Sequence, residues 1–145
     1  MRVFQSVFSD RVKVPMELIN GYSLPNYVDG ETLVMLCSYS GSTEEVLSCY
    51  VDAQKRNAKI SYFCAGGELA DKASSAGAGG YVFDPKNNPS NQPRMGLGYA
   101  VTAQIVLFAK LGLIEFSQED SGSILNAIKE TNLRFGELVA TENNQ

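Results

Sequence analysis

The sequence predicts a single α/β domain with a parallel sheet and helices on both faces. Apolar segments of strand length alternate with segments whose apolar residues recur at helical spacing, which favours a parallel sheet with crossover helices. The segment 32–37 is continuously apolar after its first residue, as expected of a strand buried on both faces. A length of 145 residues suits one domain, and a hydrophobic content of 44% is ordinary for a globular protein.

A helix and a short strand are expected first. Residues 1–9 are predicted to form the helix, because four apolar side chains fall on one of its faces: Val3, Phe4, Val7 and Phe8. Residues 13–19 are predicted to form the strand, and Pro15 places it at a sheet edge or at the strand's start. The following segment, 20–31, is a loop rich in Gly, Pro, Asn and Asp.

Two strand–helix pairs are expected next. The strand 32–37 leads into a helix over residues 43–56, whose apolar side chains form a single stripe. The strand 59–64 is followed by the turn Gly66-Gly67 and a helix over residues 68–75. Each strand is thus followed by a helix that can pack against the sheet.

The last part of the chain is predicted to contain one short strand and two helices. The strand spans residues 81–83, and a polar loop joins it to a helix from Pro93 to about Leu111, since proline suits a first helical turn. A final helix begins at Ser117 or Ser121. Its apolar residues recur at helical spacing: Ile124, Leu125, Ile128, Phe135, Leu138 and Val139.

One strand of the sheet is expected to be missing from this polypeptide. Four strands are visible, and the chain opens with a helix, whereas domains of this type normally begin with a strand. In the strand order 2-1-3-4-5 that first strand lies centrally. Its neighbours would then pair differently, or pair with another chain.

Composition argues against several classes of function. A net charge of −4 and an isoelectric point near 4.8, with no basic run, argue against a nucleic-acid-binding surface. No stretch reaches the roughly 18 apolar residues of a membrane span, and the first residues lack the apolar core of a signal peptide. We therefore expect a cytoplasmic protein that has no membrane or nucleic-acid partner.

Cysteine and histidine content limits the chemistry further. The three cysteines Cys37, Cys49 and Cys64 show no CxxC spacing and are expected to be reduced core residues. The sequence contains no histidine, which argues against nucleophilic triads and the usual zinc sites. Acid–base chemistry within these residues would have to use carboxylates, tyrosine, lysine or water.

A loop rich in hydroxyl groups lies between the buried strand and the helix that follows. Its glycine, Gly41, allows close backbone approach, and four side chains offer hydroxyl donors: Ser38, Ser40, Ser42 and Thr43. The N-terminus of the next helix adds unpaired N–H groups and the positive end of its dipole. This combination predicts a seat for the phosphate of a small molecule at the carboxyl end of a parallel strand.

Helix capping is an alternative explanation for part of this loop. Ser42, with Glu45 three residues later, matches a capping box, which needs no ligand. Capping does not explain Ser38 and Ser40, and Ser42 can cap the helix while the other hydroxyl groups face a ligand. The carboxylates of Glu44 and Glu45 are expected to stabilise the helix dipole, by about 0.3–1 kcal/mol each, rather than to act in catalysis.

Arg94 is a second candidate site residue. It follows Pro93 at the start of the predicted long helix, after the loop that leaves the last strand. This places it on the same rim of the sheet as the hydroxyl loop, where an arginine could hold a phosphate or a sugar oxygen. A solvated first-turn arginine is the alternative, and spacing alone leaves the two open.

The segment 38–47, Ser-Tyr-Ser-Gly-Ser-Thr-Glu-Glu-Val-Leu, resembles the signature of sugar isomerase (SIS) domains. The tyrosine between the two serines narrows the resemblance to one family within this superfamily. So do three further segments in the same order along the chain: Gly21–Pro25, Ala65–Leu69 and Pro93–Tyr99. Together they resemble the bifunctional phosphoglucose/phosphomannose isomerase family over nearly the whole chain.

The resemblance implies a three-layer, flavodoxin-like SIS domain over residues 1–145, as one part of a two-domain isomerase. It implies reversible interconversion of glucose 6-phosphate or mannose 6-phosphate with fructose 6-phosphate, without a metal or organic cofactor. The phosphate would be held by the loop residues Ser38, Ser40, Gly41, Ser42 and Thr43. Arg94 would lie beside C1 and C2 of the sugar and stabilise the enediolate intermediate.

The chain also departs from the family that it resembles. Its enzymes are about twice as long, open with a strand and a Gly-Gly-Ser loop, and take a glutamate base, a ring-opening histidine and a lysine from their second half. No residue here matches those motifs, so we expect an interior piece of the first domain that is inactive or nearly so alone. A non-catalytic phosphosugar-binding or regulatory module and a mainly structural subunit are the alternatives.

SIS domains usually dimerise, so a homodimer is expected. The apolar residues of the last part of the chain, among them the run 105–109, exceed what one helical face would bury. These residues could form the interface between two copies. Alternatively, the helix that carries them is covered on both sides within the domain.

Overall fold

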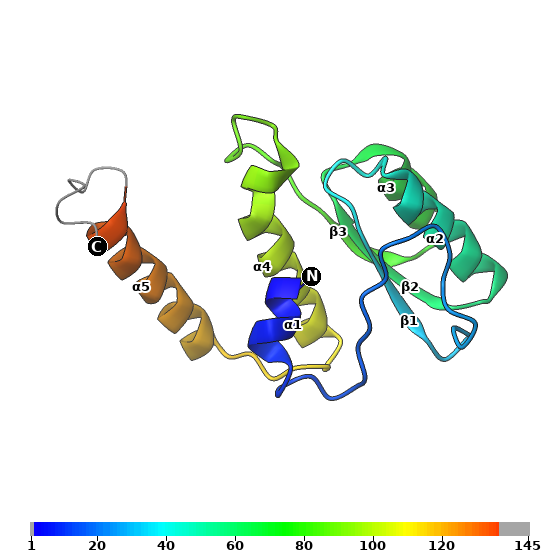
Figure 1. The fold of residues 1–145 in the computed structure, drawn as a ribbon, viewed down its shortest axis with the longest axis horizontal. Helices are drawn as coiled ribbons and strands as arrows, with labels where there is room; N and C mark the ends of the chain where they lie inside the picture. The colour runs from blue at the N-terminus through cyan, green and yellow to red at the C-terminus, as the bar shows by residue number, and fades with distance from the viewer. Residues whose placement is uncertain (1, 137–145) are drawn as a thin grey trace.

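The computed structural model describes residues 2–136 (Figure 1). Three parallel strands form one sheet in the order β1-β2-β3. The helices α2 and α3 cover one face of the sheet, whereas α1 and α4 lie on the other (Figure 1). The elements are α1 (Arg2–Phe8), β1 (Leu33–Cys37), α2 (Glu44–Lys55), β2 (Lys59–Cys64), α3 (Gly67–Ser75), β3 (Gly79–Val82), the 3-10 turn η1 (Pro93–Gly96), α4 (Leu97–Lys110) and α5 (Gln118–Phe135).

The α/β class and the parallel sheet predicted from the sequence are confirmed, and the arrangement is compatible with a flavodoxin-like fold. Leu33 of β1 is in register with Lys59 of β2, and Ser61 of β2 is in register with Gly79 of β3. β2 is therefore the central strand of the three, and β1 and β3 are the edges. Because all three strands are parallel, their carboxyl ends meet at one rim.

The prediction of a strand over residues 13–19 is wrong. In the structure this segment is extended, but it belongs to no strand, and its backbone hydrogen bond from Lys13 N runs to Leu113 O rather than to β1. Pro15 has no N–H to donate, and a groove separates the segment from β1. Without a neighbouring strand to pair with, an extended segment does not become part of a sheet.

Two predicted boundaries also move. The last strand is Gly79–Val82 instead of 81–83, because Gly79 and Gly80 already pair in register with Ser61 and Tyr62 of β2. A Cβ atom at Gly80 would lie 2.3 Å from a ring carbon of Tyr62. The predicted helix from Pro93 begins as the 3-10 turn η1 and becomes α-helical only at Leu97.

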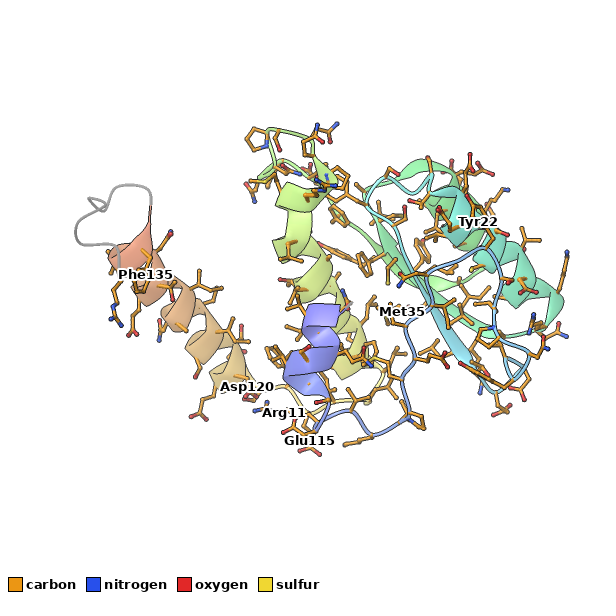
Figure 2. All side chains as sticks on the ribbon, viewed as in Figure 1. Arg11, Tyr22, Met35, Glu115, Asp120 and Phe135 are labelled. Carbon is orange, nitrogen blue, oxygen red and sulfur yellow. The ribbon has the colours of Figure 1, made fainter. Side chains whose placement is uncertain are left out.

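Apolar side chains form a separate cluster on each face of the sheet. On one face, Val34 and Leu36 pack with residues of α2 and α3. On the other, rings of α1 and α4 pack together, with the Phe4 and Phe108 centroids 4.6 Å apart, and Met35 reaches this layer from β1 (Figure 2). The three cysteines are free, as expected, and burial raises the pKa of the Cys37 thiol to about 12.

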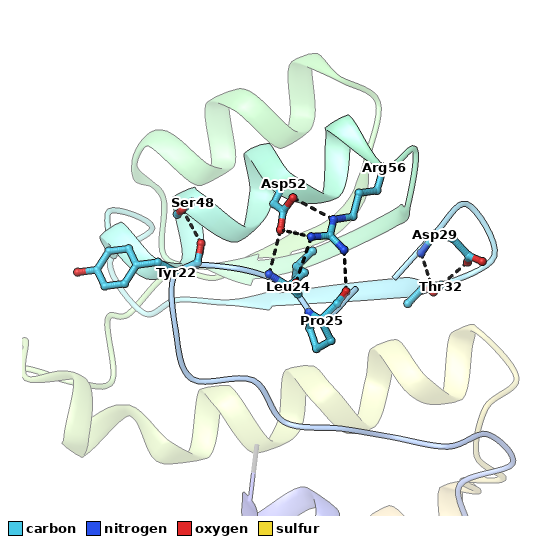
Figure 3. A network of polar contacts seen from close by, with 8 residues as sticks. All are labelled: Tyr22, Leu24, Pro25, Asp29, Thr32, Ser48, Asp52 and Arg56. Atoms are coloured by element: carbon cyan, nitrogen blue, oxygen red, sulfur yellow. Dashed lines mark hydrogen bonds and ion pairs between the residues drawn. The ribbon is translucent and has the colours of Figure 1, made fainter. Parts of the chain in front are cut away.

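An ion pair on α2 fixes the loop before β1 (Figure 3). Asp52 and Arg56 are joined by two contacts of 2.9 and 3.0 Å, and their side chains are each only 24% exposed. Asp52 also accepts the N–H of Leu24 at 2.9 Å, while Arg56 donates to the carbonyl oxygens of Leu24 and Pro25. Ser48 donates to the carbonyl of Tyr22 from the same helix, so the loop is attached to α2 at several points.

α5 extends away from the other elements (Figure 1). It begins after Ser117, one of the two predicted starts, where a capping box joins Ser117 and Asp120. None of its residues is buried, and the exposed ion pairs Arg11–Asp120 and Lys13–Glu115 connect its beginning to the region after α1 (Figure 2). The predicted helix positions Leu138 and Val139 lie outside the described residues. No helix within 2–136 has the length and apolarity that a membrane crossing requires.

The Asp52–Arg56 pair predicts a pH dependence of stability. Hydrogen bonds from Arg56 and from the Leu24 backbone lower the pKa of Asp52 below its ordinary value. Its stabilisation is therefore present above the unfolded-state pKa of about 3.9 and is lost as the pH falls through the lowered pKa of the folded state. We expect Asp52→Asn to reduce the free energy of unfolding at pH 7 and to flatten its fall in acid, measured by urea unfolding from pH 7 to pH 2.

A matched control is Asp10→Asn. Asp10 is exposed and has no hydrogen bond or ion pair with the part of the chain that the structure describes. This variant removes the same charge and should leave the urea midpoint at pH 7 unchanged. Equal midpoints for Asp52→Asn and the wild type at pH 7 would contradict the role given to the ion pair.

Candidate functional site

The hydroxyl loop lies at the rim where the carboxyl ends of the strands meet. It begins at Ser38, directly after β1, and ends at Thr43, directly before α2. The Ser38 and Thr43 hydroxyl oxygens are 2.8 Å apart and hydrogen-bonded, and Ser38 Oγ also accepts the N–H of Gly41 at 2.9 Å. Ser38 is only 5% exposed, so it braces the loop from inside. The loop is thus shaped by its own hydroxyl groups.

The exposed hydroxyl groups belong to the other three predicted residues. Ser40, Ser42 and Thr43 are all exposed. Ser40 Oγ accepts the N–H of Ser42 at 3.2 Å, whereas the Ser42 hydroxyl has no hydrogen bond among residues 2–136. Ser40, Ser42 and Thr43 are therefore the side chains of the loop that can reach a molecule outside it.

Gly41 allows the loop to touch the turn after β2. Its φ is +74°, and a Cβ atom at Gly41 would lie 1.8 Å from the carbonyl oxygen of Gly66. Gly67, with a φ of +71°, is equally constrained, since its Cβ would lie 2.5 Å from the carbonyl oxygen of Ser40. Leu69 N donates to Gly41 O at 2.9 Å. The two glycines thus hold the loop directly against the N-terminus of α3.

The N-terminus of α2 keeps donors available for an anion. Thr43, not Ser42, is the N-cap residue, and its side chain makes no capping hydrogen bond. The capping box predicted for Ser42 and Glu45 is therefore wrong, because the Thr43 hydroxyl bonds to Ser38 and the helix begins one residue later. Leu47 N is the first amide to bond back, to Thr43 O, so the preceding helical N–H groups have no intrahelical acceptor.

Glu44 and Glu45 occupy the first turn of α2, as predicted. The Tyr22 hydroxyl lies 3.4 Å from Glu44 Oε2. The negative charge of Glu45, followed by desolvation and the charge of Glu44, raises the pKa of Tyr22. Both carboxylates lie at the positive end of the helix dipole, which favours their charge there.

Tyr39 connects this loop to the segment that carries Arg94. The buried Asn88 donates to the Tyr39 hydroxyl at 2.7 Å and to Gln92 O at 2.9 Å. A Cβ atom at Gly96 would lie 2.3 Å from the Tyr39 ring, so η1 packs against the loop's own tyrosine. Arg94 lies within η1, is exposed, and forms no ion pair with any described residue.

The contribution of Tyr39 and Asn88 was not predicted from the sequence. Tyr39 lies between two predicted site residues, and this position alone could have indicated a role in the site. Asn88 lies in a polar loop and gave no signal, since its partner is 49 residues earlier in the chain. Within residues 2–136, no group of three or more His, Cys, Asp or Glu side chains is arranged to hold a metal ion.

The chain is similar to proteins named bifunctional phosphoglucose/phosphomannose isomerase. It is 40% identical to the one from Caldicellulosiruptor bescii over 136 residues, which cover 93% of this chain and 39% of the relative. It is 30% identical to the one from Thermoplasma acidophilum over 141 residues, 97% of this chain and 41% of the relative. For the Aquifex aeolicus protein the identity is 32% over 126 residues, 87% and 37% of the two chains.

The chain spans about two fifths of the length of these curated relatives, at 39% and 41% for the first two. No protein-family model matches it. The similarity therefore supports an isomerase-type relationship at the level of the relatives' names.

The close approach at Gly41 predicts a large effect of one methyl group. Gly41→Ala should destabilise the fold by about 3 kcal/mol or more, because the new Cβ meets the Gly66 carbonyl in addition to the unfavourable φ. Gly77→Ala is the matched control, since Gly77 has a φ of +72° but no atom near its Cβ position. It should cost only the left-handed strain, about 1–2 kcal/mol. Equal losses in urea unfolding would contradict the close approach.

Proposed function

We propose that the loop 38–43 binds the phosphate of a hexose phosphate, as part of an aldose–ketose isomerase that interconverts glucose 6-phosphate or mannose 6-phosphate with fructose 6-phosphate. The observation that supports this most strongly is the preformed loop itself. Exposed hydroxyl groups of Ser40, Ser42 and Thr43 stand at the uncapped N-terminus of α2, at the carboxyl rim of a parallel sheet. The relatives' names, phosphoglucose/phosphomannose isomerase, support isomerisation of a hexose phosphate.

The chemistry of the loop suits a phosphate group. Hydroxyl and backbone N–H donors can surround its oxygens, and the helix dipole favours negative charge. The loop contains no cation, and the carboxylates of Glu44 and Glu45 lie in the next turn. A positive side chain must therefore come from elsewhere. The guanidinium of Arg94, which has no ion pair within residues 2–136, is suited to this task because η1 packs on Tyr39 of the same loop.

Arg94 has two tasks in this proposal. It contributes positive charge near the phosphate seat, and beside C1 and C2 of the sugar it would stabilise the negative oxygen of an enediolate. Proton transfer between C1 and C2 needs a base in addition. In the family that the chain resembles, a glutamate base and a ring-opening histidine come from the second half of the enzyme, and this sequence contains no histidine. We infer that turnover requires groups from outside these 145 residues, and we expect the chain alone to bind substrate weakly with little or no isomerisation.

A non-catalytic phosphosugar-binding module is the second candidate function. The composition supports this candidate, because the proposed phosphate-binding loop lies in a sequence without histidine. The two candidates share the binding site and differ in whether a catalytic partner exists. The homodimer and the cytoplasmic location stay predictions under both.

Calorimetric titration with fructose 6-phosphate tests the site. Ser42→Ala should raise the dissociation constant about 10- to 150-fold, because a lost hydrogen bond to a charged group is worth about 1.5–3 kcal/mol. The Ser42 hydroxyl has no hydrogen bond within the described part of the chain, so its removal should leave stability unchanged. Ser40→Ala should weaken binding as well, and it also removes the acceptor of the Ser42 amide.

The controls separate the loop from the rest of the surface. Ser75→Ala removes an exposed hydroxyl at the C-terminal end of α3 and should leave the affinity unchanged. Fructose without the phosphate should not bind. Wild-type affinity in Ser42→Ala and Ser40→Ala, or equal binding of fructose, would place the phosphate elsewhere and refute the proposed seat.

The role of Arg94 predicts a different pattern. Arg94→Ala should weaken fructose 6-phosphate binding at least tenfold without changing the urea midpoint, since the side chain is exposed and has no ion pair in the part of the chain that the structure describes. Arg94→Lys keeps the charge but loses the planar fork and should recover part of the affinity. The matched control is Lys86→Ala, an exposed cation in the preceding loop without an ion pair among described residues. Unchanged affinity in Arg94→Ala would exclude Arg94 from the site.

A further inference from the structure

Asn88 is a buried polar side chain in the loop between β3 and η1, and it is only 6% exposed. Its amide nitrogen donates to the Tyr39 hydroxyl at 2.7 Å and to the Gln92 carbonyl oxygen at 2.9 Å. Its amide oxygen accepts the Ser90 hydroxyl at 2.7 Å. Every polar atom of the amide therefore has a partner, as a buried amide requires.

The two bonds that the Asn88 amide donates lead to the two parts of the candidate site. Tyr39 belongs to the loop 38–43, whereas Gln92 is the N-cap residue of η1, two positions before Arg94. The Gln92 carbonyl oxygen also accepts the N–H of Met95 at 3.0 Å, within η1 itself. One side chain thus joins the phosphate loop to the turn that carries the arginine.

Aromatic packing fixes the ring of Tyr39, whose hydroxyl accepts one of these bonds. Gly96 of η1 lies against one side of the ring, where a Cβ atom would be 2.3 Å from a ring carbon. The buried Phe83 ring meets the Tyr39 ring edge to face, with centroids 5.4 Å apart, and stacks on Tyr99 of α4 at 4.9 Å. The Tyr39 hydroxyl is therefore a stationary anchor for the loop that precedes η1.

We propose that Asn88 is a positioning residue of the candidate site: it holds η1, and with it Arg94, at one position relative to the loop 38–43. The inference rests on the proposed function, in which the loop binds the phosphate and Arg94 acts at C1 and C2 of the sugar. A hexose phosphate touches both places at once, so its affinity depends on a spacing that is fixed beforehand. Groups ordered before binding avoid the entropic cost of being ordered by the ligand.

A purely structural role for Asn88 is the alternative. Its backbone takes part in turns of its own loop, since its N–H donates to the Pro85 carbonyl at 2.8 Å and its carbonyl accepts the Asn91 N–H at 3.0 Å. A side chain that only stabilised this loop would affect ligand binding equally with and without the arginine. A positioning residue acts through Arg94, so its effect on binding disappears when the arginine side chain is removed.

The test is a double-mutant cycle on the full chain. Fructose 6-phosphate is titrated into the wild type, Asn88→Ala, Arg94→Ala and the double variant, and binding is followed by NMR at the amide of Gly41. Asn88→Ala should raise the dissociation constant about five- to tenfold in the wild type. In the Arg94→Ala background the same change should alter it by less than about twofold, because the group that Asn88 positions is gone.

The outcomes of the cycle separate this inference from the proposed function. An equal loss of affinity in both backgrounds would overturn the positioning role, and so would wild-type affinity in Asn88→Ala. Wild-type protein that does not bind fructose 6-phosphate at saturating concentration would refute the proposed phosphate seat, and the inference with it. That result is known before any variant is compared.

Two further variants protect the test against a change in folding. Tyr39→Phe keeps the ring that packs on Gly96 and removes only the hydroxyl acceptor, so it should give a smaller loss that also disappears in the Arg94→Ala background. Asn87→Ala is the matched control, because the Asn87 side chain is exposed and forms no hydrogen bond with the described residues. It should leave the affinity unchanged.

A measurement without ligand tests the positioning directly. The backbone order parameters of Met95 and Gly96, from ¹⁵N relaxation, should be near 0.85 in the wild type and fall toward about 0.6 in Asn88→Ala, because η1 loses its bond to the loop. Asn87→Ala should retain the wild-type values. Order parameters that stay unchanged in Asn88→Ala would overturn the inference whatever the protein binds.

Discussion

The contact between the loop 38–43 and the turn Gly66-Gly67 is the constraint on which the rest of the site depends. It joins the carboxyl ends of β1 and β2, because Ala65 N donates to Tyr39 O and Leu69 N donates to Gly41 O, at 2.8 and 2.9 Å. Two residues without side chains are needed where these backbones meet. The same contact orients Tyr39, on which Asn88 and η1 pack, so both parts of the candidate site have a common support.

The elements that follow from local pattern were predictable. β1, α2, β2 and α3 combine apolar periodicity with glycine turns, and their positions agree with the prediction within a few residues. The segment 13–19 was not predictable, because strand formation requires a pairing partner that a local pattern does not reveal. The boundary of β3 depends on the pairing of Gly79 and Gly80 with residues of β2 that lie 18 positions earlier in the chain. Propensity alone carries no information on such contacts.

For the candidate site, the residue types indicated the chemistry of the loop, but they did not indicate the role of each residue. The serines and Thr43 were recognised as one hydroxyl loop. Which of them brace the loop and which face outward depends on distances that only the structure gives. Ser38 and Thr43 bond to each other, which leaves Ser42 without a partner among the described residues and moves the helix cap to Thr43. The similarity to proteins named as isomerases covers about two fifths of the length of those relatives.

The pairing of α1 with α4 has a consequence for the order of folding. The sheet and its helices α2 and α3 are formed by strands that follow one another closely in the sequence, so their contacts close short loops. The Phe4–Phe108 contact instead joins residues more than 100 positions apart, and closing so long a loop costs more conformational entropy. The β1–β3 half should therefore assemble first and offer a template on which the aromatic layer later condenses. The topology therefore predicts two stages of folding, in which the α1–α4 layer forms after the sheet.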